Sequence, residues 1–243
     1  VGLYSNYLMI INIINSYVAT AFNAVTASLG NLIVTESDDR KEEVFRKLNF
    51  IAYLLYGTCT VGLISVFSSF ITLWIGNKYT LDGITTIVIV LNFYLTGMRI
   101  PIQSMKSAAG LFDVDKYTPL IQSFINLVIS IVLAQKIGLL GVLLGTLISS
   151  IVLPCWQRPY LIYKFVLHKS CKSYFINYIK QCFITFFSAF IVHFILSFIM
   201  IENLFFLFLV QGTLSVVVFW LFTYLFYRNS EEFKYLINLI LRR

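Results

Sequence analysis

Residues 91–110 read LNFYLTGMRIPIQSMKSAAG and decide the fold class of this chain. Polar residues recur every three or four positions in this otherwise apolar stretch, so on a helix they form one stripe. The members of the stripe are Asn92, Thr96, Arg99, Gln103 and Lys106. A helix with one polar stripe is typical of a membrane protein, in which the stripe faces water or other helices and the remainder faces lipid. Pro101 lacks a backbone N–H, which predicts a kink inside the stripe.

The composition places the whole chain in a membrane. Of its 243 residues, 59% are hydrophobic and 12% are charged, whereas ordinary soluble domains carry about 25% charged residues. The net charge of +7 does not indicate nucleic-acid binding, because the basic residues lie between the apolar stretches. The four cysteines show no metal-binding spacing. Because the chain begins with Val1 and enters an apolar segment at once, we expect it to belong to a longer protein.

Seven apolar stretches are each near the ~20 residues that a bilayer core requires. The predicted fold is therefore all-α and integral to the membrane, with about seven transmembrane helices. The predicted spans are Leu3–Ala27, Leu48–Trp74, Ile84–Met105, Pro119–Ala134, Leu139–Tyr160, Ile179–Met200 and Leu204–Tyr227. Only residues 135–138 separate the fourth span from the fifth, which predicts a tight hairpin. The Gly141-x-x-x-Gly145 spacing in the fifth span predicts close helix contact.

The distribution of lysine and arginine predicts the orientation. Sixteen of the 18 basic residues fall in alternate loops and the tail, and only two fall in the remaining loops. Basic loops face the cytoplasm, so the first residues are predicted to lie outside and the carboxy terminus in the cytoplasm.

Two basic connectors have more than one interpretation. Residues 35–48, TESDDRKEEVFRKL, are predicted to be a solvated cytoplasmic connector; the alternative is a short helix with acidic residues first and basic residues last. Residues 161–178 mix aromatic and lysine side chains and fit either a basic loop or an amphipathic interfacial linker. The predicted domains are accordingly 1–160, the linker 161–178, and two further helices with a tail over 179–243.

Amide-rich stripes recur in the first and fourth spans. A buried amide is costly in hydrocarbon unless it finds a partner, so these residues either bond between helices or line a hydrated cavity. Single amides fit the first interpretation, and three stripes with an arginine favour the second. The predicted substrate cavity comprises Asn12, Asn15, Asn23, Asn92, Thr96, Arg99, Gln103, Lys106, Gln122 and Asn126.

The length of the third span places its two basic residues. Arg99 follows Ile84 by 15 residues, or about 22 Å into a core of about 30 Å, so its side chain either faces the cavity or reaches the headgroups. Lys106 is predicted at the cytoplasmic mouth. No acidic residue lies well inside any predicted span, and a basic cavity rich in amides suits an anionic, hydroxyl-rich cargo.

Three stretches resemble bacterial polysaccharide repeat-unit flippases, the O-antigen and capsular oligosaccharide transporters of the multidrug/oligosaccharidyl-lipid/polysaccharide (MATE-like) superfamily. The most specific matches are Gly110-Leu111-Phe112, Asn126 and the run Gly141–Thr146. The resemblance covers residues 1–172, whereas the last two spans match only in being hydrophobic. The stretches are residues 1–32, FRKLNF at 45–50, and residues 98–150.

The resemblance implies a V-shaped transporter of two six-helix lobes, with this chain as helices eight to twelve of the carboxy-terminal lobe plus two extra helices. It implies a flippase, and no enzyme, that moves undecaprenyl-pyrophosphate-linked oligosaccharide from the inner to the outer leaflet of the bacterial cell membrane by alternating access. It also implies that cavity arginines engage the pyrophosphate or acidic sugars, and among the arginines here only Arg99 occupies such a position. Implied partners are the lipid-linked oligosaccharide, membrane lipids and the polysaccharide polymerase and chain-length machinery.

Other functions stay open from sequence alone. A membrane enzyme of polysaccharide assembly, either a polymerase or a lipid-linked glycosyltransferase, requires carboxylates or arginines in a large outer loop, and the outer loops here carry only Asp82 and Glu202. A drug or cation exporter of the same fold requires acidic residues inside the spans. No cofactor or metal is predicted, and coupling to an ion or proton stays open.

Overall fold

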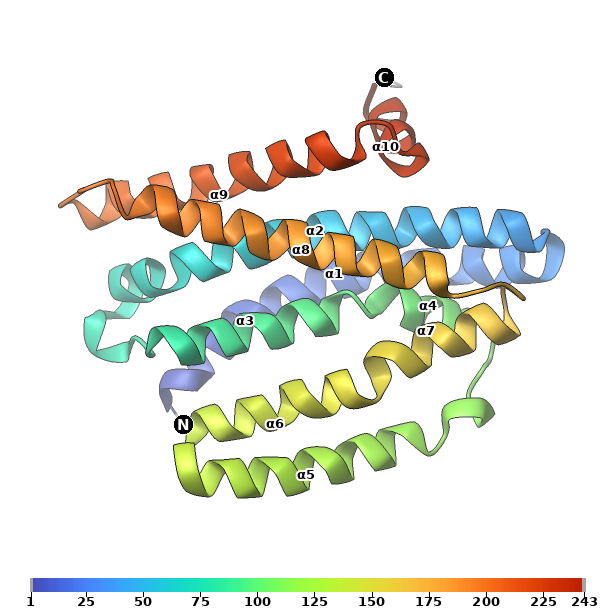
Figure 1. Cartoon of the computed structure of the whole chain (residues 1–243), viewed down its shortest axis with the longest axis horizontal. Coiled ribbons are helices and arrows are strands. Elements are labelled where there is room, and N and C mark those ends of the chain that lie inside the picture. The colour runs from blue at the N-terminus through green and yellow to red at the C-terminus, as the bar shows by residue number, and fades with distance from the viewer. Residues whose placement is uncertain (1, 242–243) are drawn as a thin grey trace. The chain divides into compact units, whose positions relative to one another are not determined.

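A computed structural model describes residues 2–241, and over that range all regular structure is helical (Figure 1). Seven helical segments are long and apolar enough to cross a membrane, which confirms the predicted number of spans. The helices are α1 (Gly2–Thr35), α2 (Asp38–Ile75), α3 (Gly83–Gly97), α4 (Ile100–Ala108), α5 (Thr118–Ile137), α6 (Leu139–Val152), α7 (Pro154–Phe165), α8 (Lys172–Leu196), α9 (Leu204–Tyr227) and α10 (Glu231–Leu241). Two short 3-10 turns, η1 (Asn77–Tyr79) and η2 (Asp113–Asp115), lie in the connections.

Two of the spans are broken at proline. The third span divides into α3 and α4, with Met98 and Arg99 between them and Pro101 in the first turn of α4. This break confirms the predicted kink, since proline cannot donate to the preceding turn. The fifth span divides in the same way into α6 and α7, with Pro154 opening α7, and this second break was not predicted.

The prediction for the first basic connector was wrong about where the second helix begins. Only Glu36 and Ser37 separate α1 from α2, because the residues predicted as a solvated connector form the first turns of α2. The Ser37 hydroxyl accepts a hydrogen bond from the Arg40 N–H at 3.4 Å, and Asp38 and Asp39 occupy the positive end of the helix. In the second connector, α7 continues to Phe165 and α8 begins at Lys172, so residues 166–171 form a loop, which was one of the two interpretations. The amphipathic helix of the chain is instead α10, in the predicted tail.

Contacts divide the chain into two compact units. Unit 1 comprises Val1–Phe45 and Leu81–Ile176, and unit 2 comprises Arg46–Thr80 and Asn177–Arg243. The second unit is held by hydrogen bonds between helices, from Tyr53 to Thr223 at 3.0 Å and from Ser65 to Ser215 at 2.6 Å. It therefore joins most of α2 to the last two spans.

Within unit 1, the loops predicted to share one side of the membrane meet at one end. The ammonium group of Lys169, which follows α7, lies 2.5 Å from a carboxylate oxygen of Asp39 and 2.6 Å from one of Glu42, both in the first turns of α2. These carboxylates raise the pKa of Lys169, so the lysine is fully charged at neutral pH. At the other end, the Tyr7 hydroxyl of α1 accepts a hydrogen bond from the Leu81 N–H at 3.0 Å. The arrangement agrees with the alternation predicted from the basic residues.

The α5–α6 hairpin packs backbone against backbone. Gly138 turns the chain with a φ of 60°, a conformation that residues with a Cβ rarely adopt, and its N–H donates to the Ala134 carbonyl at 2.9 Å. A Cβ atom added at Gly141 would meet the backbone of Leu133, and one added at Gly145 would meet the hydroxyl of Ser130. Figure 1 shows the two helices side by side, and the contact confirms the hairpin and the predicted glycine spacing.

Candidate substrate groove between α1 and α4

The polar stripes of the first and third spans meet in unit 1, where α1 packs against α4. A hollow of about 390 Å³ lies between them. Its lining follows helical spacing on both sides, because residues three or four apart share one face of a helix. The lining residues are Ala19, Asn23 and Thr26 from α1, and Ile100, Gln103, Ser104 and Ser107 from α4.

The groove offers neutral hydrogen-bonding groups. The amides of Asn23 and Gln103 are exposed, so they are available to water or to a bound molecule. Ser104 is buried at the base, and the Thr26 hydroxyl donates to the Phe22 carbonyl at 3.1 Å. An amide offers both donors and an acceptor, a combination that suits sugar hydroxyls. Exposure of two amides in hydrocarbon is costly, which favours water in this groove.

Two arginines lie beside the breaks in the kinked spans. Arg99 precedes α4, is half-buried, and donates from Nη2 to the Thr96 hydroxyl at 3.2 Å. Arg158 lies within α7 and is also half-buried. Both guanidinium groups lie near enough to Cys155 to act on its thiol electrostatically. Unit 1 therefore carries one permanent positive charge at the break before α4 and another within α7.

Arg158 was not among the predicted site residues, although its position in the sequence made it a candidate. It falls inside the predicted fifth span, Leu139–Tyr160, yet it was counted among the basic residues of the following loop. A charged residue inside an apolar span is a candidate functional residue by position alone. Its neighbour Gln157 accepts a hydrogen bond from the Thr118 hydroxyl at 3.1 Å, which ties α7 to the start of α5.

Two predicted cavity residues instead join helices. Asn92 donates to the Val88 carbonyl of its own helix and to the Leu143 carbonyl of α6, both at 3.0 Å. Asn126 donates to the Thr146 hydroxyl at 3.4 Å and accepts from Ser130 at 2.8 Å. These bonds occupy the amides in α3–α6 and α5–α6 packing, as the first interpretation of the stripes expected.

Lys106 forms a buried ion pair. Its ammonium group lies 2.6 Å from one carboxylate oxygen of Asp115 and 2.7 Å from the other, and the Asp115 side chain is almost fully buried. The lysine also lies 5.7 Å from the centre of the Phe112 ring. Because Asp115 in η2 neutralises it, Lys106 fixes the connection after α4 rather than offering a charge to an anion.

The remaining predicted residues lie apart from the groove lining. Asn12 is exposed on α1, and Asn15 is half-buried one turn further along the same helix. Gln122 is half-buried on α5, one turn before the residues that pack on α6. Of the ten predicted cavity residues, Asn23 and Gln103 line the groove itself.

A solved structure shares this arrangement of helices, that of the lipid II flippase MurJ in an inward closed conformation. The match covers 90% of this chain with a TM-score of 0.57 and 18% sequence identity. The fold is MurJ-like. The chain spans about half of MurJ, since the match covers 47% of the MurJ chain. No family model and no curated protein sequence matches the chain. The likeness concerns the fold, and the seven apolar helical segments fit a multi-pass membrane protein.

Proposed function

We propose that this chain forms part of a flippase that moves an oligosaccharide on a lipid pyrophosphate carrier from the inner to the outer leaflet of a bacterial cell membrane. The observation that carries the proposal is the groove of unit 1, where exposed amides on α1 and α4 face each other within a MurJ-like fold. A transporter of this cargo requires a hydrated path for sugar hydroxyls beside apolar surface for the lipid chain.

The side chains of the groove and the arginines near the two helix breaks suit distinct parts of the cargo. Asn23 and Gln103 exchange hydrogen bonds with sugar hydroxyls, since each amide both donates and accepts. Arg99 and Arg158 bind the pyrophosphate, because a guanidinium group presents a planar fork of donors that matches phosphate oxygens and stays charged at every relevant pH. Lys106, by contrast, is already paired with Asp115.

Alternating access requires a part of the structure that changes shape between two states. The breaks before α4 and α7 are the natural positions for bending, because the proline at each break leaves the helix without one backbone hydrogen bond. Both arginines lie within a few residues of a break. In this proposal, bending at the breaks changes the distance between α4 and α7, and Arg99 and Arg158 bind the pyrophosphate close to these breaks.

Complementation tests the proposal. The complete reading frame that encodes this chain is expressed in a bacterium that lacks its own repeat-unit flippase, and surface polysaccharide is measured at equal protein level. We expect Arg99→Ala with Arg158→Ala to lower export at least about tenfold, since hydrogen bonds to charged groups contribute about 1.5–3 kcal/mol each. Arg228→Ala, at the end of α9, is the matched control and leaves export unchanged.

Two results would contradict the proposal. Failure of the wild-type protein to restore any surface polysaccharide in several flippase-deficient strains would remove the function. Full export by the double arginine variant would keep the function and remove both arginines from phosphate binding.

A further inference from the structure

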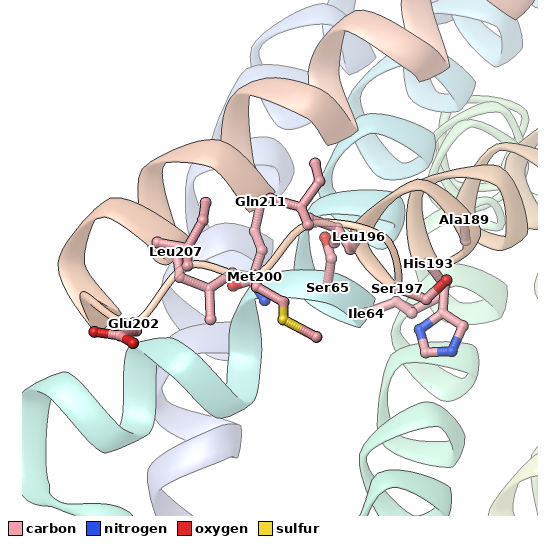
Figure 2. A pocket seen from close by; sticks show the side chains of 12 residues that line it. Ile64, Ser65, Ala189, His193, Leu196, Ser197, Met200, Glu202, Leu207 and Gln211 are labelled. Atoms are coloured by element: carbon pink, nitrogen blue, oxygen red, sulfur yellow. The ribbon is translucent and has the colours of Figure 1, made fainter.

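Unit 2 contains a hollow that the proposed function does not use. It measures about 550 Å³ and lies among α2, α8, α9 and the turn that joins α8 to α9. This volume falls within the range of small-molecule sites. Figure 2 shows Glu202 at one end of the hollow and His193 at the other, with Met200 and Gln211 between them.

The lining is apolar with a few hydrogen-bonding groups. Apolar side chains supply seven of its 12 residues, namely Ile64, Ala189, Leu196, Ile199, Met200, Ile201 and Leu207. No lysine or arginine is among its 12 residues, so it is poorly suited to a phosphate or carboxylate. An apolar wall with a few polar groups at fixed positions is the usual design of a site for an amphiphile.

One polar atom in the hollow lacks a partner. Within the described chain, no hydrogen-bond donor reaches the Gln211 side-chain oxygen, which is buried. A buried acceptor without a donor destabilises the folded state, so a ligand that donates a hydrogen bond there offsets this cost. The neighbouring Ser65 hydroxyl is engaged with Ser215 at 2.6 Å, and the Ser197 hydroxyl donates to the Phe194 carbonyl at 2.7 Å.

The charge at the rim has the matching sign. Glu202 is exposed and forms no salt bridge among the described residues, so its carboxylate is available at the mouth of the hollow. A carboxylate and a buried carbonyl oxygen both accept hydrogen bonds and both attract positive charge. A protonated amine with N–H donors suits each of these two acceptors.

We propose that this hollow binds the primary ammonium group of an amphiphile, with Glu202 as its counter-ion, Gln211 as its hydrogen-bond acceptor and the aliphatic wall around its chain. Two sources carry this chemistry, a free alkylamine and the headgroup of an aminophospholipid. The site shares no residue with the groove in unit 1, so a test of one proposal does not decide the other.

Thermal unfolding of the purified protein in a neutral detergent tests the site. A ligand that binds the folded state raises the melting temperature in proportion to its occupancy. We expect a saturable rise with dodecylammonium, a smaller one with dodecyltrimethylammonium, which has no N–H, and none with dodecanol. Glu202→Gln and Gln211→Leu weaken dodecylammonium binding at least about tenfold, whereas Glu231→Gln and Gln135→Leu leave it unchanged. Because Glu202 is exposed, its variant keeps the test valid if Gln211→Leu does not fold.

A second experiment distinguishes a free alkylamine from the headgroup of an aminophospholipid. Native mass spectrometry of protein from nanodiscs that mix phosphatidylethanolamine and phosphatidylcholine shows retained phosphatidylethanolamine if the headgroup is the ligand. Retention of neither lipid, together with dodecylammonium binding, identifies a free amine, and both results support the site. Equal stabilisation by dodecanol, or wild-type affinity in Glu202→Gln, would overturn it.

Discussion

Gly141→Ala tests how closely the α5–α6 hairpin is packed. An added Cβ atom would lie 2.6 Å from the Ala134 nitrogen and closer still to the Leu133 carbonyl group. Real Cβ atoms essentially never come within 3.0 Å of such neighbours, so the two helices must move apart. The obstacle is backbone and not a flexible side chain, so a change of rotamer does not relieve it.

The expected cost follows from two opposing effects. Alanine favours a helix over glycine by about 1 kcal/mol, and overpacking costs about 1–3 kcal/mol. Because the clash is with backbone, the upper end applies, and we expect a net loss of about 1–2 kcal/mol. Separation of the helices also stretches the hydrogen bond from Asn126 to Thr146, which is already 3.4 Å long.

The assay is reversible unfolding of the reconstituted protein, with Gly62→Ala and Gly212→Ala as matched controls. Both control glycines lie in spans, and a Cβ atom added at either meets nothing within 4 Å. We expect the controls to be neutral or stabilised by their better helix propensity. A Gly141→Ala protein as stable as Gly62→Ala would refute the close packing.

Three further substitutions test other parts of the fold by the same unfolding assay. Asn92→Leu removes the hydrogen bond to α6 and is expected to lower stability by about 0.6–1.7 kcal/mol; no loss would show that the bond is dispensable. Asp115→Asn leaves Lys106 buried without its counter-ion and is expected to cost about 3–5 kcal/mol, and an unchanged midpoint would contradict the buried pair. Asp82 caps α3, and hydrogen bonds from the side chain and N–H of Thr85 lower the pKa of its carboxyl group. Asp82→Ala should therefore cost about 1 kcal/mol at pH 7, and the difference should shrink as the pH falls below the ordinary pKa of about 3.9; a difference that persists at low pH would exclude the charged cap.

Much of the fold was predictable because it follows from local patterns. Seven apolar stretches of membrane-spanning length, a proline inside the third, and paired glycines after a short turn each have one structural outcome. The number of spans, the break at Pro101 and the close contact at Gly141 were confirmed on that basis.

Helix ends were predicted less well, because charge was taken as a sign of a loop. Residues 38–47 are charged yet contain no proline or glycine, so α2 begins ten residues before the apolar stretch. The break at Pro154 was overlooked, since the flanking residues are apolar enough to continue the span.

The residues that line the site depend on how each helix is rotated about its axis, and the sequence alone does not determine this rotation. A stripe predicts which residues share a face, and the structure then decides what that face meets. The face that carries Asn92 meets α6, whereas the face that carries Gln103 meets α1 across the groove. Lys106 pairs with Asp115, nine residues further along the chain. This contact could not be predicted from helical spacing, because an irregular turn separates the two residues.

Cysteine accessibility in sealed membrane vesicles tests most directly the claim that the α1–α4 groove holds water. Asn23→Cys and Gln103→Cys are compared with Val25→Cys, which lies on α1 two residues beyond Asn23, and with the unsubstituted protein, whose four native cysteines are half-buried. Thiols react with a charged maleimide only where water reaches them. We predict fast labelling at positions 23 and 103 and none above background at position 25. Equal labelling at all three positions, or none at 23 and 103, would contradict the hydrated groove.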